Sequence, residues 1–201
     1  AQAAAELKWI WTNLYGDFPF ADVGESSPDD VGRVAQFERA RTVPGAFVGL
    51  AASLTILARP AILGAVPGVI FEAPTQGSGK SLGMHVVSMV TTGRPAGVMT
   101  FPMRNGEPIE EELEKVLSAY ALGGASVIAF DNIAGNLAGA ALDKVLTAVS
   151  TIALRPLGES KVKTMPWSAI TLFSGNNMTM SADVARRTMM SRIVSSLESP
   201  S

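Results

Sequence analysis

Residues 74–82, with the sequence PTQGSGKSL, combine the residue types that bind phosphate in proteins. Gly77 and Gly79 allow the backbone to turn its N–H groups inward around an anion, and a helix that starts at Lys80 would direct its positive end at the same anion. The Lys80 ammonium group would bind the β- and γ-phosphates of ATP, and the Ser81 hydroxyl would coordinate Mg²⁺. Contacts with the nucleotide are expected from Pro74, Thr75, Gln76, Gly77, Ser78, Gly79, Lys80, Ser81 and Leu82.

The residues around this loop are also those of a phosphate-binding site. An apolar run, residues 68–71, precedes the loop, and residues 82–90 follow it with no proline and one glycine, so the expected order is strand, loop and helix. Pro74 departs from the pattern G-x-x-x-x-G-K-[ST], because the first glycine is missing, while the other three fixed positions are present. The alternative interpretation is a glycine-rich turn that binds no ligand.

A later apolar run ends in an acid that belongs at the same place. Residues 125–132, ASVIAFDN, predict a buried strand that ends at Asp131, at the edge of a parallel sheet where the loop also lies. Asp131 would hold Mg²⁺ through water on one side while Ser81 holds it on the other. Ser81 and Asp131 are therefore the predicted metal ligands. A strand-end aspartate that only caps a helix is the alternative.

Residues 170–177, ITLFSGNN, predict another strand that ends in polar side chains. The Asn176 amide offers both a donor and an acceptor, so it could orient the attacking water or touch the γ-phosphate. Two adjacent asparagines are also common in turns. Just beyond them, Arg186 and Arg187 either belong to a solvated helix face or reach the nucleotide of a neighbouring subunit as an arginine finger.

These side chains need a scaffold, and the hydrophobic pattern from Val66 onward predicts one. Apolar runs alternate with helical segments, which is typical of an α/β fold with a parallel sheet covered by helices. Strands are predicted near residues 68–72, 96–101, 125–131 and 168–174, with 189–194 as a candidate fifth strand, and helices near 80–91, 108–122 and 138–153. Together with the loop motif, this pattern resembles a P-loop ATPase core, which we expect over residues 63–201.

Residues 1–62 predict a helical lead-in to this core. Apolar residues at helical spacing predict a first helix over residues 3–14, and the sequence SPDD at 27–30 predicts the start of a second helix that runs to about residue 41. A third, apolar helix is expected over residues 46–57. Because the chain stops soon after the candidate fifth strand, we expect it to be a fragment of a larger protein.

The composition limits the class of protein. With 201 residues, 47% of them hydrophobic and 17% charged, the chain can bury one core and has apolar surface for other subunits or domains to cover. Proline or glycine interrupts the longest uncharged stretches, and the N-terminus lacks a signal-peptide pattern, so we expect a cytoplasmic protein without a membrane segment. The net charge of −2 shows no general nucleic-acid footprint, so DNA contact would need a local basic patch.

The order of the motifs resembles that of a known family. A loop, an acid-ended strand, a strand that ends in asparagine and then arginine are similar to the AAA+ P-loop ATPases, and among them to the superfamily 3 helicases of small DNA viruses, phages and plasmids. The segments DFPF (17–20), APTQGSGKS, VIAFDN, LGES and SGNN followed by RR resemble the ATPase domain of phage and mobile-element replication proteins of the primase-helicase kind. The resemblance covers about residues 7–195.

The resemblance implies a parallel sheet sandwiched by helices, ATP and Mg²⁺ as cofactors, and a homo-oligomeric ring, with a hexamer as one candidate. It makes Asn176 the polar sensor and Arg187, with Arg186 next to it, the finger. It also makes Arg155 a further charge near the γ-phosphate, which could act across the subunit interface. One subunit would then hold an incomplete site.

The resemblance also implies single-stranded DNA as a partner. Superfamily 3 helicases grip DNA with a hairpin, rich in basic and aromatic residues, in the pore of the ring. In the matching region this chain has Lys161, Lys163 and Trp167, and the loop is short. Lys161 and Lys163 are therefore the candidate DNA contacts. The implied setting is the cytoplasm of a bacterium or of a phage-infected cell, with flanking domains in the full-length protein.

Asn132 leaves the catalytic base open. It stands where many ring ATPases carry a glutamate, and an amide cannot take a proton from water. Either another carboxylate is the base, with Glu107 and Glu72 as candidates, or hydrolysis relies on positioning and charge stabilisation, or turnover is slow. The leading expectation is a Mg²⁺-dependent ATPase motor domain of a phage or plasmid type DNA replication helicase. The alternatives are a nucleotide-dependent switch or scaffold with weak hydrolysis, and a small-molecule kinase built on the same loop.

Overall fold

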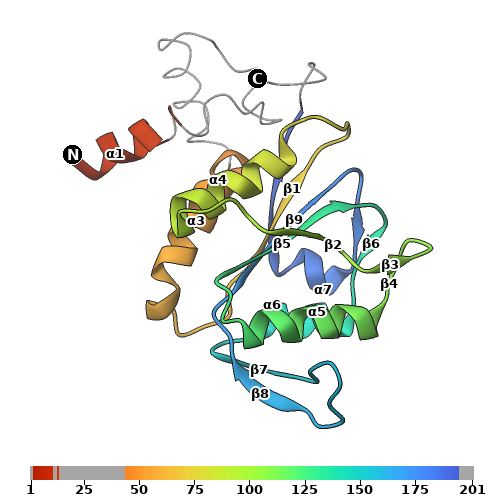
Figure 1. Cartoon of the computed structure of the whole chain (residues 1–201). Coiled ribbons are helices and arrows are strands. Elements are labelled where there is room, and N and C mark those ends of the chain that lie inside the picture. Colours follow the sequence, from red (N-terminus) through yellow and green to blue (C-terminus); the bar gives the residue numbers. More distant parts are fainter. Residues whose placement is uncertain (1, 11–12, 14–43, 195–201) are drawn as a thin grey trace.

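The computed structural model describes residues 2–10, 13 and 44–194, and in these residues the chain forms an α/β fold around one parallel sheet (Figure 1). The strands of this sheet are β1 Gly68–Glu72, β2 Val98–Thr100, β5 Val127–Ile133, β9 Ile170–Gly175 and β11 Thr188–Arg192. Their spatial order is β11-β1-β9-β5-β2, and every pairing is parallel. The strands therefore all end at one edge of the sheet, the carboxyl edge, and all begin at the other, the amino edge.

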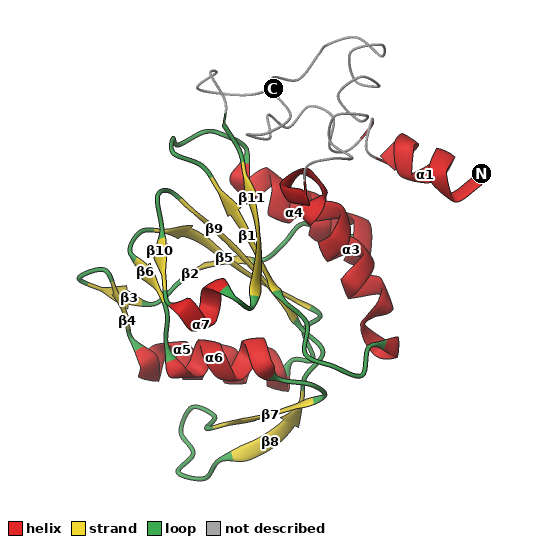
Figure 2. Ribbon diagram, turned by 180° about the vertical axis from the view of Figure 1, so that it is seen from behind, coloured by secondary structure: helices red, strands yellow, loops and turns green. Residues whose placement is uncertain are grey.

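Helices cover both faces of the sheet (Figures 1 and 2). One face carries α3 (Val48–Ala58) and α4 (Lys80–Thr92), and the other carries α5 (Glu110–Leu122), α6 (Ala140–Thr147) and α7 (Ala182–Ala185). From β1 the chain crosses over β9 and β5 to reach β2 at the edge of the sheet. The later connections, β2 to β5, β5 to β9 and β9 to β11, run in the opposite direction across the sheet. Because such crossovers are right-handed, opposite directions place the connecting helices on opposite faces.

Each face of the sheet has its own hydrophobic core, because side chains alternate along every strand. In β1, Val69 and Phe71 pack under α3 and α4, and Ile70 packs on the other face. Phe130 and Phe173, from the neighbouring strands β5 and β9, stack in this second core with ring centroids 6.0 Å apart. Both cores contain large side chains that are almost fully buried.

Short strands lie beyond both the carboxyl edge and the amino edge of the sheet. At the carboxyl edge, β3 (Met103–Arg104) pairs with β4 (Glu107–Pro108), and β6 (Asn136–Leu137) pairs with β10 (Thr179–Met180). An antiparallel hairpin of β7 (Thr151–Leu154) and β8 (Lys163–Pro166) precedes β9 and extends beyond the amino edge, at the bottom of Figure 1. The remaining elements are α1 (Gln2–Ile10), η2 (Pro44–Phe47) and η3 (Arg59–Ala61).

The predicted order of strands and helices in the core is confirmed, including the candidate fifth strand, which is β11. One predicted helix, 138–153, is wrong over its second half, since α6 ends at Thr147 and the chain continues into β7. Side chains from Thr151 to Leu154 alternate between exposed and buried, which is the period of a strand. The predicted strand 96–101 is shorter in the structure, and the strand predicted to end at Asp131 continues to Ile133.

The lead-in is described only in part. The helix predicted over 46–57 corresponds to η2 and α3, and α3 shares a core with α4 and β1 through Ala52 and Ile56. The first predicted helix, 3–14, overlaps α1. The second predicted helix, which runs to about residue 41, and the DFPF segment lie outside the described residues. Among the described helices, none has the length and apolar character needed to cross a membrane.

Candidate functional site

The candidate site lies at the carboxyl edge, where the direction of the chain connections changes. The helix that follows β1 covers one face of the sheet, and the helix that follows the adjacent strand β9 covers the other. In open α/β sheets, ligands bind in the crevice that such a change opens beyond the carboxyl ends of the strands. The segment between β1 and α4, residues 73–79, is at this point, and we call it the glycine-rich loop (top of Figure 1).

The glycine-rich loop folds back on itself around Thr75. The Ser78 hydroxyl donates to the Thr75 carbonyl at 2.7 Å and lies 2.9 Å from the Thr75 hydroxyl. Gly77 and Gly79 have φ of 73° and 85°, in the left-handed region that glycine enters without steric strain. The loop therefore closes tightly and leads directly into α4, whose first backbone N–H groups have no partner within the helix.

Lys80, the first residue of α4, is only 8% exposed. Its Nζ donates to the Thr75 carbonyl at 2.9 Å, so the side chain turns back over the loop. Burial lowers the pKa of Lys80 below its usual value, and the nearby charge of Asp131 acts in the opposite direction. A buried ammonium group next to unpaired N–H groups is an environment that favours an anionic ligand.

Ser81 and Asp131, fifty positions apart in the sequence, are in direct contact. The Ser81 hydroxyl lies 2.8 Å from Oδ2 and 3.0 Å from Oδ1 of the Asp131 carboxylate. α4 brings Ser81 to one side of the crevice, and β5 brings Asp131 from two strands away. The structure thus brings together the two residues that the sequence predicted as metal ligands.

Ser174, at the end of β9, is a third member of this cluster, and the sequence analysis missed it. Its hydroxyl is fully buried and donates to Oδ1 of Asp131. The backbone N–H of Asn132 donates to the same Oδ1 at 2.8 Å and to the Ser174 hydroxyl at 3.3 Å. The signal that could have identified Ser174 is its position at the end of an apolar strand, but only the strand order shows that β9 lies between β1 and β5.

Asn132 has an unusual backbone for a residue with a side chain. Its φ is 57°, and the pairing of β5 with β9 shifts register between Phe130 and Ile133. Asparagine enters the left-handed region more readily than other residues with a side chain, apart from aspartate. The Asn132 side chain is exposed, so the described contacts of this residue with the cluster come from its backbone N–H. The residue type is thus explained by conformation.

The turn after β9 touches the glycine-rich loop. The Ala73 N–H donates to the Gly175 carbonyl at 3.3 Å, and the Asn177 amide lies 3.5 Å from the Pro74 carbonyl. Asn176 lies between these contacts, and its side-chain oxygen is buried without a hydrogen-bond partner in the part of the chain that the structure describes. A buried amide oxygen of this kind is an acceptor available to a ligand or a water.

The two candidate bases are not in this cluster. Glu72, at the end of β1, is 8% exposed, and its carboxylate lies 3.5 Å from Arg192 on the adjacent strand β11. Glu107 is exposed on β4 and accepts from the Asn136 amide at 3.3 Å. Within residues 44–194, neither carboxylate shares a hydrogen bond with Asp131. The structure therefore identifies no base among the candidates from the sequence.

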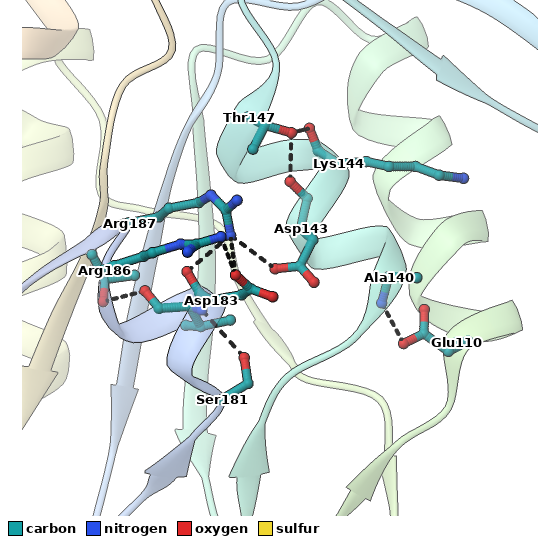
Figure 3. Close-up of polar contacts among 11 residues, drawn as sticks. Glu110, Ala140, Asp143, Lys144, Thr147, Ser181, Asp183, Arg186 and Arg187 are labelled. Carbon is teal, nitrogen blue, oxygen red and sulfur yellow. Dashed lines mark hydrogen bonds and ion pairs between the residues drawn. The ribbon is translucent and has the colours of Figure 1, made fainter.

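Arg186 and Arg187 lie at the amino edge, away from the glycine-rich loop. The Arg187 carbonyl accepts from the N–H of Gly68, which begins β1, whereas the loop follows the other end of that strand, about 13 Å away. The Arg187 guanidinium lies 3.2 Å from the Asp183 carboxylate and 3.7 Å from that of Asp143, and Arg186 pairs with Asp183 (Figure 3). The structure does not bring these arginines to the loop of their own chain.

The remaining predicted residues belong to the β7–β8 hairpin. Arg155 is exposed directly after β7, and Lys161 is exposed in the loop of the hairpin. Lys163 begins β8 and forms an ion pair with Glu159 at 2.6 Å. Trp167, only 4% exposed, packs in the second core, so it is not available to stack on a base. The hairpin with Lys161 and Lys163 lies beyond the amino edge, at the opposite end of the sheet from the glycine-rich loop (Figure 1).

The cluster fits a magnesium ion better than a metal held by protein ligands alone. No group of three histidine, cysteine, aspartate or glutamate side chains that could hold a metal occurs in the described part of the chain. Asp131 and Ser81 would supply one carboxylate and one hydroxyl. Mg²⁺ is commonly bound in this way, because it keeps several waters and takes its other ligands from substrate phosphates.

Comparisons with known proteins add no further assignment. No family model matches the sequence, and no curated protein matches it. The geometry of the carboxyl edge is therefore the basis for a functional proposal.

Proposed function

We propose that this chain is the Mg²⁺-dependent ATP-binding and ATP-hydrolysing motor domain of a phage or plasmid type DNA replication helicase. The observation that supports it most is the contact between Ser81, which follows the glycine-rich loop in α4, and Asp131, near the end of β5, two strands from β1 in the sheet. A loop of this composition in front of a helix, with an acid opposite the helix start, is the arrangement used by P-loop ATPases.

Each group in the crevice has a role in binding the nucleotide. The N–H groups at the start of α4 and the Lys80 ammonium group bind the phosphates, because both present positive charge to the same space. Lys80 exchanges its hydrogen bond with the Thr75 carbonyl for a stronger one with a phosphate oxygen. Ser81 and Asp131 hold Mg²⁺, which neutralises charge on the phosphates when it is bound.

Hydrolysis needs a water in line with the γ-phosphate. The Asn176 side-chain oxygen, buried and without a partner among the described residues, accepts a hydrogen bond from this water and orients it. An amide does not take the proton, so Asn176 positions the water and a phosphate oxygen or bulk water receives the proton. This predicts slow hydrolysis by a single subunit.

An oligomeric ring completes the site. Arg187 and Arg155 lie away from the loop of their own chain, so they can stabilise γ-phosphate charge only on a neighbouring subunit. In the same ring, the exposed Lys161 and Lys163 of the hairpin supply contacts with the phosphates of single-stranded DNA.

A steady-state ATPase assay with and without single-stranded DNA tests this proposal. Turnover that requires Mg²⁺ and rises with DNA is expected. Turnover that rises only with a small phosphate acceptor would replace the motor with a kinase. Failure of the protein to bind either ADP or ATP would remove the proposal altogether.

A second candidate function is a nucleotide-dependent switch or scaffold with weak hydrolysis. The observation in its favour is Asn132, which stands next to Asp131 with an exposed amide in place of an acid and with a backbone that suits asparagine. Tight nucleotide binding without turnover, in the presence of DNA and at a protein concentration that permits assembly, would favour the switch over the motor.

A further inference from the structure

The arrangement of donors around Asp131 carries an inference that rests on the proposed function. We propose that Ser174 is a positioning residue for the magnesium site. With the Asn132 N–H, its hydroxyl holds Oδ1 of Asp131, so that Oδ2 is the oxygen that faces the cation. Ser174 itself does not touch the cation or the nucleotide.

The two oxygens of the Asp131 carboxylate have different partners. Oδ1 accepts from the Ser174 hydroxyl and from the Asn132 N–H at 2.8 Å, and it lies 3.0 Å from the Ser81 hydroxyl oxygen. Oδ2 accepts only from the Ser81 hydroxyl, at 2.8 Å, among the contacts that the structure describes. The two donors that come from the sheet itself therefore both bind the same oxygen.

This asymmetry matters because Ser81 is itself a proposed ligand. When its hydroxyl oxygen coordinates the cation, its hydrogen bond with Asp131 has to rearrange, and the donors from Ser174 and Asn132 remain. The terminal torsion of an aspartate is broad and has little intrinsic preference, so other groups have to fix the plane of the carboxylate. Ser174 and the Asn132 N–H fix it through Oδ1 and leave Oδ2 directed toward Ser81.

Ser174 is suited to this role because its hydroxyl both donates and accepts a hydrogen bond and the residue is fully buried. It donates to Asp131 and accepts from the Asn132 N–H at 3.3 Å, so it links the carboxylate to the backbone of β5. Ser191, at the matching depth on β11, provides a contrast: it is also fully buried, but its hydroxyl has no partner within the described range 44–194. A buried serine in this sheet is therefore not by itself a sign of a role in the cluster.

The test compares Ser174→Ala with the matched control Ser191→Ala, since both remove one fully buried hydroxyl from a strand of the same sheet. Calorimetry measures the affinity for ADP in EDTA and again in saturating Mg²⁺. The ratio of the two affinities reports the coupling between metal and nucleotide without any turnover. We expect Ser174→Ala to reduce this ratio about tenfold, the scale of one hydrogen bond to a charged group. Its affinity for ADP in EDTA should stay within about twofold of wild type, because the described hydrogen bonds of the Ser174 hydroxyl go to Asp131 and Asn132 and none goes to the glycine-rich loop.

Each outcome decides between the proposals. An unchanged ratio in Ser174→Ala, with ADP binding intact, would overturn the positioning role and leave the proposed function standing. An equal loss in Ser191→Ala would also overturn it, because the effect would then be general repacking of the sheet. If wild type binds no ADP under either condition, the proposed function itself fails.

A second substitution covers the case in which Ser174→Ala does not fold. Ser174→Cys keeps a side chain of similar size with a weaker donor, and the chain has no other cysteine to complicate its chemistry. The expected order of the coupling ratio is Ser, then Cys, then Ala. A cysteine variant with the full wild-type ratio would count against the hydrogen bond as the cause.

Discussion

The two edges of the sheet hold their polar side chains in opposite ways. At the carboxyl edge, Lys80 is 8% exposed and donates to the Thr75 carbonyl, and Ser174 is fully buried and donates to Asp131. At the amino edge, Arg186 is exposed, Arg187 is about one quarter exposed, and both form ion pairs with Asp183 near the surface. The carboxyl edge is a hydrogen-bonded network of buried and half-buried groups, whereas the amino edge carries ion pairs closer to solvent.

The difference indicates what each edge can do. Buried and mutually bonded groups are held in one geometry, which is what binding a triphosphate and a cation requires. Surface ion pairs contribute little to stability, so the arginines can leave Asp183 for a better anion at small cost. The carboxyl edge thus suits a site within one chain, and the amino edge suits contacts with another molecule.

The largest effect is expected from a substitution at the amino edge, at Arg187. If Arg187 is the arginine finger of the proposed ring, Arg187→Ala should lower the rate of ATP hydrolysis by about 10³-fold or more, while ADP affinity stays near wild type. Asp183→Asn is the control, because it removes the carboxylate that pairs with Arg187 but leaves the guanidinium in place. A rate loss in Asp183→Asn as large as in Arg187→Ala would show that the ion pair matters instead of the finger.

A mixture of variants tests whether Arg187 acts on a neighbouring subunit. Arg187→Ala subunits keep an intact loop, and Lys80→Ala subunits keep an intact arginine, so mixed oligomers contain some complete sites. Activity in the mixture above that of either parent would support a shared site. Mixed assembly without recovered activity, or a wild-type rate that is independent of protein concentration down to the monomer, would contradict it.

The next largest effect belongs to the carboxyl edge. Lys80→Ala should weaken ATP binding about 100-fold, because a charge-assisted hydrogen bond is lost while the phosphate remains. Lys144→Ala is the matched control, since Lys144 is half exposed and pairs with Glu114 on α5, away from the loop. Calorimetry measures both. Wild-type affinity in Lys80→Ala would exclude the glycine-rich loop as the phosphate site.

The sequence predicted most of the scaffold because its signals are local. Glycines, prolines and the hydrophobic period predict where strands and helices lie, and the proximity of Ser81 and Asp131 follows from two motifs that both lie at the carboxyl edge, one in the loop and helix after β1 and one near the end of β5. The helix predicted over 138–153 is wrong in its second half because the local hydrophobic period changes within that range. Residues 140–147 have a helical period, but Thr151–Leu154 have a period of two, and a single helix was extended over both.

The parts of the site that the sequence could not predict depend on strand order. Ser174 reaches Asp131 only because β9 pairs between β1 and β5, and that order is set by long-range contacts. The left-handed backbone of Asn132 depends in the same way on a register shift between β5 and β9. The sequence predicted which polar residues stand at the ends of the strands, but it could not predict which strand pairs with which.

A smaller effect is expected from the hairpin beyond the amino edge. If Lys161 and Lys163 contact DNA phosphates, replacing both by alanine should flatten the dependence of log affinity on log salt by about 1.4, or about 0.7 for each contact with a single strand. Lys161→Ala alone should have the larger share, because Glu159 already neutralises Lys163 at 2.6 Å. Fluorescence anisotropy with a labelled oligonucleotide at several salt concentrations measures the slope. An unchanged slope would remove the hairpin from DNA binding.

The smallest effect concerns Asn132 and separates its backbone from its side chain. Its φ of 57° predicts that Asn132→Glu lowers the free energy of unfolding by about 1 kcal/mol, because most side chains are strained in this region. Asn105, in the turn between β3 and β4, has φ of 52° and is also exposed, so Asn105→Glu is the matched control away from the cluster. Urea denaturation should give similar losses for both variants, and a loss at Asn132 alone would contradict the backbone explanation.

The same pair of variants also shows whether the cluster lacks a base. A glutamate at position 132 would stand beside Asp131, where its carboxylate could accept a proton from water, whereas a glutamate at position 105 lies on a separate turn. If turnover rises several-fold in Asn132→Glu and stays at wild type in Asn105→Glu, the carboxyl edge is a binding network that lacks only a proton acceptor. If turnover falls in Asn132→Glu by no more than its loss of folded protein explains, then the amide is not what limits the rate. In that case the charges of the amino edge, supplied by a neighbouring subunit, are the remaining determinant of hydrolysis.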